Sequence, residues 1–90
     1  MLTDFQKRVY EEVKKIKKGQ VKSYGQLAKK LKTSPRAIGQ ALKKNFNPEI
    51  PCHRVIKSNG ELGGYNKGII KKIKLLRSEG VKIKGGKIQT

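Results

Sequence analysis

One short segment, Pro51-Cys52-His53-Arg54-Val55, holds the residues of this chain that are best suited to nucleophilic chemistry. Cys52 is the only cysteine of the sequence, and His53 is its only histidine. A thiol becomes a strong nucleophile when a nearby imidazole or cation favours the thiolate. Because consecutive side chains point in different directions, we expect His53 to act on Cys52 through a water molecule. A cysteine without such neighbours is more often a small buried apolar residue.

Glu79 is a candidate third member of this group. It is predicted to lie in the last turn of a helix, where the helix macrodipole disfavours an anion. A cation or an imidazole beside it would explain this position, and a carboxylate that orients a histidine completes the logic of a catalytic triad. Glu79 is therefore expected to orient His53. The alternative is an exposed carboxylate that pairs with one of the many lysines.

Arg36 is predicted to lie in the first turn of a different helix, where the macrodipole disfavours a cation. At the leading end of a DNA-reading helix such an arginine can take the place of a flipped nucleotide, although exposed arginines are commonly without function. Ala37 and Gly39 behind it are small, and glycine inside a helix costs about 1 kcal/mol relative to alanine. This cost indicates a close approach to another backbone. Tyr24 is either a core aromatic residue or a phosphate contact.

Composition limits the partners that this chain can have. Its 90 residues are the size of one domain, and 23 lysines and arginines against 6 acidic residues give a net charge of +17. Such a charge is typical of proteins that bind nucleic acid or a membrane surface. No apolar run approaches the roughly 20 residues that span a bilayer, and no signal peptide opens the chain. One cysteine and one histidine are too few for a zinc site, so we expect no metal and no cofactor.

Capping signals and apolar periodicity predict three helices in the first half of the chain. The first begins behind a capping box at Thr3 and runs to about Lys17, before Gly19. The second begins behind a capping box at Ser23, and the third begins at the cap Ser34 with proline at its first position. Two short helices joined by a tight turn form a helix-turn-helix unit, although an ordinary helical hairpin has the same pattern.

The second half predicts a hairpin, a helix and a terminal ribbon. Val55 and Ile56, the turn Asn59-Gly60 and Leu62 are typical of a small hairpin. A fourth helix closed by Gly80 is expected to present the apolar stripe Ile69, Ile70, Ile73, Leu75 and Leu76. A short ribbon around Gly85-Gly86 follows. The whole order predicts a mainly α fold, a winged helix with a helix-turn-helix and a small β-hairpin wing, in one domain spanning residues 1–90.

The stretch from Gln20 to Gly80 resembles the C-terminal DNA-binding and active-site domain of the O6-alkylguanine-DNA alkyltransferases (methylated-DNA–protein-cysteine methyltransferases). The motifs that carry the resemblance follow one another in order: Ser23-Tyr24-Gly25, Arg36-Ala37-Ile38-Gly39, Asn45, Pro51-Cys52-His53-Arg54-Val55-Ile56, Gly63-Gly64-Tyr65 and Leu75-Leu76-Arg77-Ser78-Glu79-Gly80. The N-terminal domain usual in that family is absent from these 90 residues.

The resemblance implies a protein that repairs DNA by direct reversal. Cys52 would accept the alkyl group from O6 of guanine irreversibly, in a single turnover after base flipping. His53 would deprotonate Cys52 through water, and Glu79 would orient His53. Asn45 matches a hinge asparagine of the family, but the link to Cys52 is one residue shorter than the common pattern, so Asn47 competes for this role.

The resemblance also implies the contacts with DNA. Arg36 would replace the flipped base, and Tyr24 would crowd the adjacent phosphate and protonate the leaving guanine. The helix that carries Ala37 and Gly39 would enter the minor groove. The base pocket would be formed by three further residues, with the carbonyls of Cys52 and Val55 contacting the exocyclic amine: Val55, Tyr65 and Asn66.

The expected partner is therefore double-stranded DNA that contains O6-alkylguanine, bound by a monomer in the cytoplasm at the nucleoid, with no membrane partner. Two alternatives stay open. One is a non-enzymatic binder that flips alkylated guanine without repairing it, although its known relatives carry tryptophan in place of Cys52. The other is a winged-helix regulator, which would show no preference for a lesion.

Overall fold

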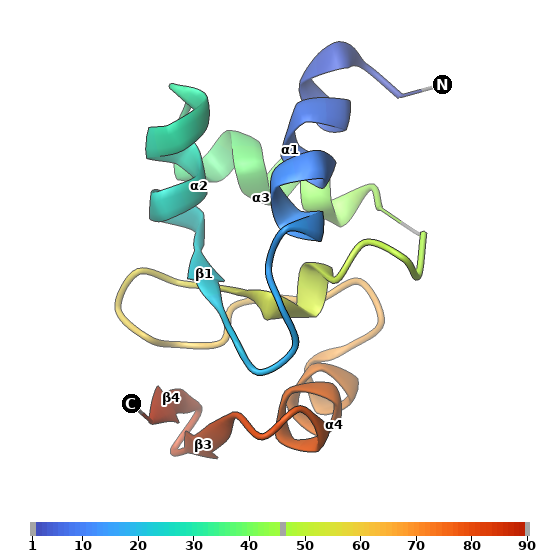
Figure 1. Ribbon diagram of the computed structural model, residues 1–90. Coiled ribbons are helices and arrows are strands. Elements are labelled where there is room, and N and C mark those ends of the chain that lie inside the picture. Colours follow the sequence, from blue (N-terminus) through green and yellow to red (C-terminus); the bar gives the residue numbers. More distant parts are fainter. Residues whose placement is uncertain (1, 46, 90) are drawn as a thin grey trace.

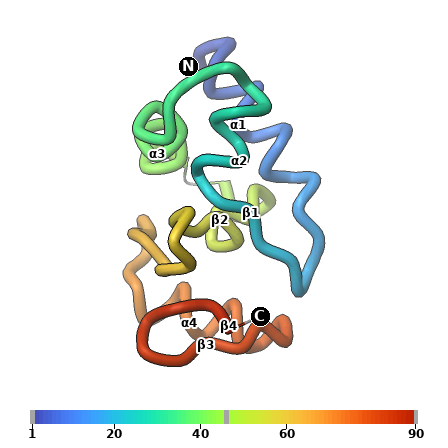
Figure 2. The backbone as a smooth tube through the Cα atoms, turned by 90° about the vertical axis from the view of Figure 1, so that its left-hand side faces the viewer, coloured from blue at the N-terminus to red at the C-terminus, as the bar shows by residue number. Residues whose placement is uncertain are grey.

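The computed structural model describes residues 2–45 and 47–89. Helices α1, α2 and α3 lie together at one end of the molecule, and α4 lies with β3 and β4 at the other (Figures 1 and 2). The segment that contains Cys52 runs between these two parts. The elements in chain order are α1 (Asp4–Lys14), β1 (Lys22–Ser23), α2 (Tyr24–Leu31), α3 (Pro35–Lys43), a 3₁₀ helix (Cys52–Arg54), β2 (Val55–Ile56), α4 (Ile69–Ser78), β3 (Lys82–Lys84) and β4 (Lys87–Gln89).

The predicted helix starts are confirmed. Thr3 Oγ1 accepts from the Gln6 N–H at 3.0 Å, while the Thr3 N–H donates to Gln6 Oε1 at 2.9 Å. Ser23 and Gln26 repeat this exchange at the start of α2, and the Ser34 hydroxyl caps α3. Each cap satisfies a backbone N–H that has no partner inside its helix and is worth about 1 kcal/mol.

Helix α1 is shorter than expected, because it ends at Lys14 and not near Lys17. Ile16 is still buried, with 2% of its surface exposed, and its carbonyl accepts from Arg54 Nη1 at 2.8 Å. The Gln20 N–H, which would bond this carbonyl in a continued helix, donates to the Lys17 carbonyl instead, at 2.9 Å. The turn that follows contains Gly19 at a φ of +85°, a conformation that favours glycine.

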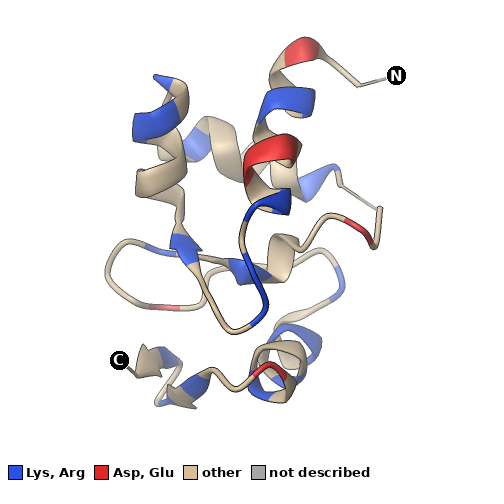
Figure 3. Cartoon of the chain, in the orientation of Figure 1, with Lys and Arg blue, Asp and Glu red and all other residues tan. Residues whose placement is uncertain are grey.

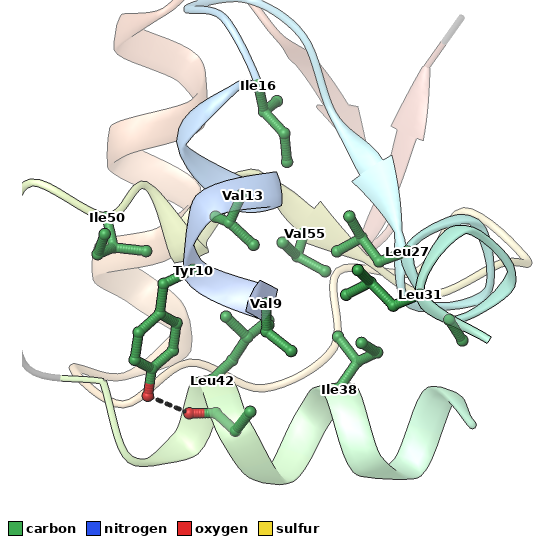
Figure 4. Close-up of a cluster of buried hydrophobic side chains, with 12 residues drawn as sticks. Val9, Tyr10, Val13, Ile16, Leu27, Leu31, Ile38, Leu42, Ile50 and Val55 are labelled. Atoms are coloured by element: carbon green, nitrogen blue, oxygen red, sulfur yellow. Dashed lines mark hydrogen bonds between the residues drawn. The ribbon is translucent and has the colours of Figure 1, made fainter. Parts of the chain in front are cut away.

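The main core lies between α1, α2 and α3 and extends to β2 (Figure 4). Figure 4 also shows the Tyr10 hydroxyl of α1 donating to the Ala41 carbonyl of α3, at 2.6 Å. Burying each such aliphatic side chain stabilises the fold by about 1.5–3 kcal/mol. This core holds α2 and α3 at a fixed angle, and its central side chains are Val9, Val13, Leu27, Leu31, Ile38, Leu42 and Val55.

The expected hairpin from Val55 to Leu62 is wrong in its pairing. Strand β2 pairs with β1 in parallel, with Lys22 opposite Val55. The predicted turn before Glu61 does form, because the Lys57 N–H donates to the Glu61 carbonyl at 2.8 Å and the Gly60 N–H to the Lys57 carbonyl at 3.0 Å. Glu61 then forms a bridge with Lys87 of β4 and not with β2. Val55 and Ile56 are both buried, and a strand next to β1 satisfies their backbone while it covers the core. The terminal ribbon is confirmed as the antiparallel pair β3–β4.

The apolar stripe expected on α4 is also wrong in part. Ile69 and Ile70 are 42% and 64% exposed, whereas Leu76 and Lys72 are fully buried. The buried face of α4 thus passes through a lysine. The predicted end of α4 is confirmed, because Gly80 has a φ of +89° and the next N–H donates to the Leu76 carbonyl at 3.0 Å.

Candidate active site and nucleic-acid interface

Cys52 opens the 3₁₀ helix and is half-buried at the junction of two clefts. One cleft of about 640 Å³ reaches toward α2 and α3, and its other lining residues are Tyr24, Gly39, Leu42, Lys43, Gly64, Tyr65 and Asn66. A smaller one of about 170 Å³ lies on the side of α4 and is also bordered by Asn45, Asn47, His53 and Lys71. The thiol is therefore accessible from the face that α3 presents.

His53, Arg54 and Glu79 form one hydrogen-bonded group beside Cys52. His53 Nε2 lies 3.0 Å from Glu79 Oε2, and Arg54 bonds both carboxylate oxygens, from Nε at 2.9 Å and from Nη2 at 2.7 Å. The bond from Arg54, together with the one from His53, holds the pKa of Glu79 below its ordinary value. The unfavourable helix position of Glu79 is thus offset by a cation and an imidazole together.

This geometry decides which nitrogen of His53 can act as a base. An ionised carboxylate only accepts hydrogen bonds, so Nε2 carries the proton that it donates to Glu79. In a neutral imidazole, Nδ1 is then the nitrogen that carries the lone pair. The imidazole also meets the Tyr65 ring edge-on, with ring centres 6.4 Å apart and planes at 76°. Glu79 and Tyr65 thus hold the ring in one orientation.

Asn45, not Asn47, is the buried asparagine of the link between α3 and Cys52. Asn45 Oδ1 accepts from the Asn47 N–H at 3.0 Å, which turns the chain away from α3. Asn66 Nδ2 donates to the carbonyls of Asn45 and Leu42, at 2.6 and 3.0 Å. Asn66 therefore joins the wall of the larger cleft to the end of α3, while the side chain of the exposed Asn47 accepts from the Glu49 N–H of its own turn.

Tyr24, the first residue of α2, packs against the backbone of Gly63. A Cβ at Gly63 would lie 3.2 Å from the Tyr24 ring and 3.3 Å from its hydroxyl oxygen, and Gly63 also has a φ of +73°. Burial raises the pKa of Tyr24, and negative charge on Cys52 raises it further. The hydroxyl on this wall of the cleft therefore keeps its proton at neutral pH and is available as a hydrogen-bond donor.

The leading half of α3 is open to solvent. Arg36 is exposed, while Ala37 and Gly39 are half-buried. A Cβ at Gly39 would meet no heavy atom of the described chain within 4 Å, so no backbone of this chain explains the glycine.

Val55 was expected to line the base pocket, but its side chain lies in the core. Its side chain is fully buried in the core and borders neither cleft, and its carbonyl accepts from Lys72 Nζ at 2.7 Å. Tyr65 and Asn66, in contrast, border both clefts together with Cys52.

Sequence reasoning missed two residues beside this site. Arg54 had a signal, because it follows the Cys-His pair directly and Glu79 needed a cation. Lys72 had none, because one more lysine in so basic a chain does not stand out.

The charged residues of α2 and α3 are all lysines and arginines (Figure 3). Neither helix contains an acidic residue, and their cations are Lys29, Lys30, Arg36 and Lys43. In the part of the chain that the structure describes, Lys30 is the one cation of these that forms an ion pair, with Glu12 of α1. The exposed side of this helix pair is therefore suited to a polyanion.

Among residues 2–45 and 47–89, no three histidine, cysteine or acidic side chains lie close enough together to hold a metal ion. No helix of this part is long and apolar enough to cross a membrane.

Comparison with known families and curated proteins identifies related sequences. The family model described as "6-O-methylguanine DNA methyltransferase, DNA binding domain" matches residues 4–81. A methylated-DNA–protein-cysteine methyltransferase of Methanocaldococcus vulcanius is 56% identical over 82 residues, which are 90% of this chain and 50% of that protein. The chain thus spans about half the length of the curated relatives that it matches.

Two solved structures with DNA have the same fold. Mycobacterium tuberculosis OGT in complex with DNA superposes with a TM-score of 0.83 at 40% identity, over 89% of this chain and 51% of that one. Schizosaccharomyces pombe Atl1 in complex with damaged DNA containing O6-carboxymethylguanine superposes with a TM-score of 0.80 at 33% identity. That comparison covers 99% of this chain and 91% of Atl1.

Proposed function

The chain belongs to the family of 6-O-methylguanine DNA methyltransferase DNA-binding domains, and from this premise we propose that it repairs alkylated guanine in DNA by direct reversal. The observation that carries the proposal is the group formed by His53, Arg54 and Glu79 beside the half-buried thiol of Cys52. A histidine that is oriented by a carboxylate and lies next to the only cysteine of the sequence is suited to nucleophilic chemistry. A protein that only binds DNA does not need such a group.

The reaction is a single displacement at the alkyl carbon. Nδ1 of His53 accepts the Cys52 proton through a water molecule, and the thiolate attacks the alkyl carbon. The new S–C bond forms as the C–O6 bond breaks, and its electron pair stays with the guanine. Tyr24 donates its proton to the leaving base, and the resulting tyrosinate regains a proton from the solvent while the imidazolium of His53 releases one to it. Because the thioether is stable, each protein molecule reacts once.

DNA is held by α2, the turn at Lys32-Thr33 and α3, which act as the helix-turn-helix of a winged helix. The capped start of α3 approaches the minor groove, where Ala37 and Gly39 leave room for the backbone. Arg36 takes the place of the flipped nucleotide, which enters the larger cleft beside Tyr65 and Asn66. The protein works as a monomer and corresponds to the C-terminal domain of its longer relatives.

A second candidate is a binder that recognises alkylated guanine without removing the alkyl group. The near-complete coverage of Atl1, whose structure contains damaged DNA, favours it. The reactive group around Cys52 favours repair.

Intact mass spectrometry distinguishes the two functions. The protein is incubated with a duplex that contains O6-methylguanine, with an unmodified duplex as control. Repair predicts a mass gain of one methyl group in place of a hydrogen, located on Cys52 by peptide mapping and absent from Cys52→Ala. An unmodified protein that still binds the lesion duplex in preference to the control duplex would establish the binder.

A further inference from the structure

The terminal ribbon formed by β3 and β4 has one apolar face and one basic face. Side chains of directly opposite residues lie on the same face, and successive residues alternate between the faces. The opposite pairs are Lys82 with Gln89, Ile83 with Ile88, and Lys84 with Lys87. The two isoleucines pack against the smaller core around Leu76, so the three lysines lie on the outer face of the ribbon.

The three lysines of this outer face are exposed, and none of the ion pairs in the described part of the chain includes them. Glu61 pairs with Lys87 as an isolated bridge, but its Oε1 accepts from Asn59 Nδ2 at 2.5 Å. Lys84 lies directly opposite Lys87. Like charges in this arrangement destabilise a ribbon. A bound anion would remove that cost.

The ribbon lies at the end of the molecule opposite to α2 and α3 (Figures 1 and 2), and Figure 3 shows basic residues on both of its strands. The longest dimension of the molecule is 35 Å. Salt screens a charge over about 8 Å at physiological ionic strength. The ribbon lysines therefore add little to the attraction between α2, α3 and a duplex bound there.

The outer face suits a phosphate backbone better than a membrane surface. Lys82 and Lys84 are two residues apart on one strand, so their Cα atoms are about 6.7 Å apart, close to the separation of successive phosphates along one DNA strand. Lys87 adds a third cation on the neighbouring strand. Stable binding to a membrane surface also uses exposed apolar side chains, and the ribbon packs its isoleucines against the core.

We propose that the outer face of the β3–β4 ribbon is a second DNA-binding surface, which holds the phosphate backbone of a duplex other than the one bound by α2 and α3. One protein molecule then bridges two segments of DNA. Because lysines contact phosphates and not base edges, this surface requires neither a particular sequence nor a lesion. The proposal rests on the proposed function in one respect, the binding of the first duplex by α2 and α3.

A bridging experiment with unmodified DNA tests the proposal. One duplex is attached to beads, a second duplex is fluorescent and free, and the protein is added at a concentration below that of the duplexes. The fluorescent duplex is captured only by a particle that has two DNA-binding surfaces. We expect the wild type to capture it, and the double variant Lys84→Gln/Lys87→Gln to capture it at least about tenfold less strongly in 0.1 M salt. The salt dependence of capture should also fall, by about 0.9 in slope for each lost phosphate contact.

Three controls accompany this experiment. Binding of a single short duplex, measured by fluorescence anisotropy, should be unchanged in Lys84→Gln/Lys87→Gln, because α2 and α3 are intact. Its thermal denaturation should match the wild type, because the substitutions remove a repulsion from exposed positions. Lys7→Gln/Lys14→Gln removes the same charge from α1 and should bridge like the wild type. Arg36→Ala/Lys43→Gln should weaken both single-duplex binding and bridging.

Three outcomes would overturn the proposal. The first is a wild type that captures no second duplex. The second is a ribbon variant that bridges as well as the wild type, which is the result expected of a dimer with one DNA surface on each copy. The third is an equal loss of single-duplex binding and of bridging in the ribbon variant, because the ribbon and α3 would then hold the same duplex.

A failure of the proposed function gives a different result. No alkylguanine is used, so the absence of repair would leave the bridging data interpretable. If Arg36→Ala/Lys43→Gln binds a single duplex as tightly as the wild type, the assignment of α2 and α3 as the reading face is wrong. The comparison between the ribbon variant and the wild type is made separately from that result.

Discussion

The guanidinium of Arg54 and the carboxylate of Glu79 lie side by side, joined by two hydrogen bonds of 2.9 and 2.7 Å. This pair connects the segment directly after Cys52 to the end of α4, and the third contact of Arg54 reaches the Ile16 carbonyl behind α1. Glu79 Oε2 bonds Arg54 and His53 at once. The position of the proposed base therefore depends on an arginine that reaches it through Glu79.

Arg54→Ala should destabilise the fold by about 3 kcal/mol, because it leaves a largely buried carboxylate without its main partner. It should also slow alkyl transfer, since Glu79 is then free to move and take His53 with it. Urea denaturation and single-turnover kinetics measure the two effects. Arg77→Ala, which removes an exposed arginine of α4, is the control, and an equal loss of stability in both variants would contradict the assignment.

The pair also makes stability depend on acid pH. The pKa of Glu79 in the folded protein is held below its ordinary value of 4.5 by Arg54 and His53. A carboxyl group with a depressed folded pKa adds stability above its unfolded pKa, and this stability is lost as pH falls through the folded pKa. The free energy of unfolding of the wild type should therefore decline below about pH 4.5, and that of Glu79→Gln should decline less over the same range. Urea midpoints at a series of pH values test this, with Glu11→Gln of α1 as the control.

Local signals carried most of what the sequence could predict. The capping boxes at Thr3 and Ser23 involve residues three positions apart, so they form wherever the helix forms. The closure of α4 at Gly80 and the terminal ribbon are equally local. The partner of Val55 was missed because β1 lies more than thirty residues earlier, and a Val-Ile pair carries no sign of which strand it joins.

Buried charge was the second feature that the sequence could not predict. Ile70 looks like a core residue and Lys72 like a surface residue, yet their exposures are reversed. Three backbone carbonyls outside α4 accept hydrogen bonds from the Lys72 ammonium. The sequence of α4 does not show that these carbonyls converge on Lys72. The contact between His53 and Glu79 was predictable, because an anion at the end of a helix needs a partner.

His53→Ala should lower the rate of alkyl transfer at neutral pH by about 10²–10⁴-fold, the usual effect of losing a general base. The deficit should shrink as pH rises above the ordinary thiol pKa of about 8.5, because the thiolate then forms without help. Transfer from a free O6-benzylated guanine, followed over a pH series, measures this without a contribution from DNA binding. A deficit that is constant at every pH would assign His53 to the fold and not to proton transfer.

Arg36→Ala should slow transfer from duplex DNA far more than transfer from the free modified base, because only the duplex requires a flipped nucleotide to be held out of the stack. Arg36 is exposed, so its loss should leave stability unchanged within about 0.5 kcal/mol. Arg8→Ala removes an exposed arginine of α1 and is the matched control for net charge. If both substrates lose rate equally, Arg36 acts in the chemistry or the fold instead.

Gly39→Ala separates stability from binding on the helix that is proposed to read DNA. A methyl group at Gly39 would meet no atom of the described chain within 4 Å, and the residue lies within the regular part of α3. Alanine should therefore stabilise the protein by up to about 1 kcal/mol, the ordinary helix preference over glycine. If α3 packs closely on the sugar-phosphate backbone of a groove, the same methyl group should weaken duplex binding. A bulkier Gly39→Leu should weaken it further. Thermal denaturation and fluorescence anisotropy with a labelled duplex measure the two quantities. A variant that gains stability and binds DNA as tightly as the wild type would place the DNA on another surface of this chain.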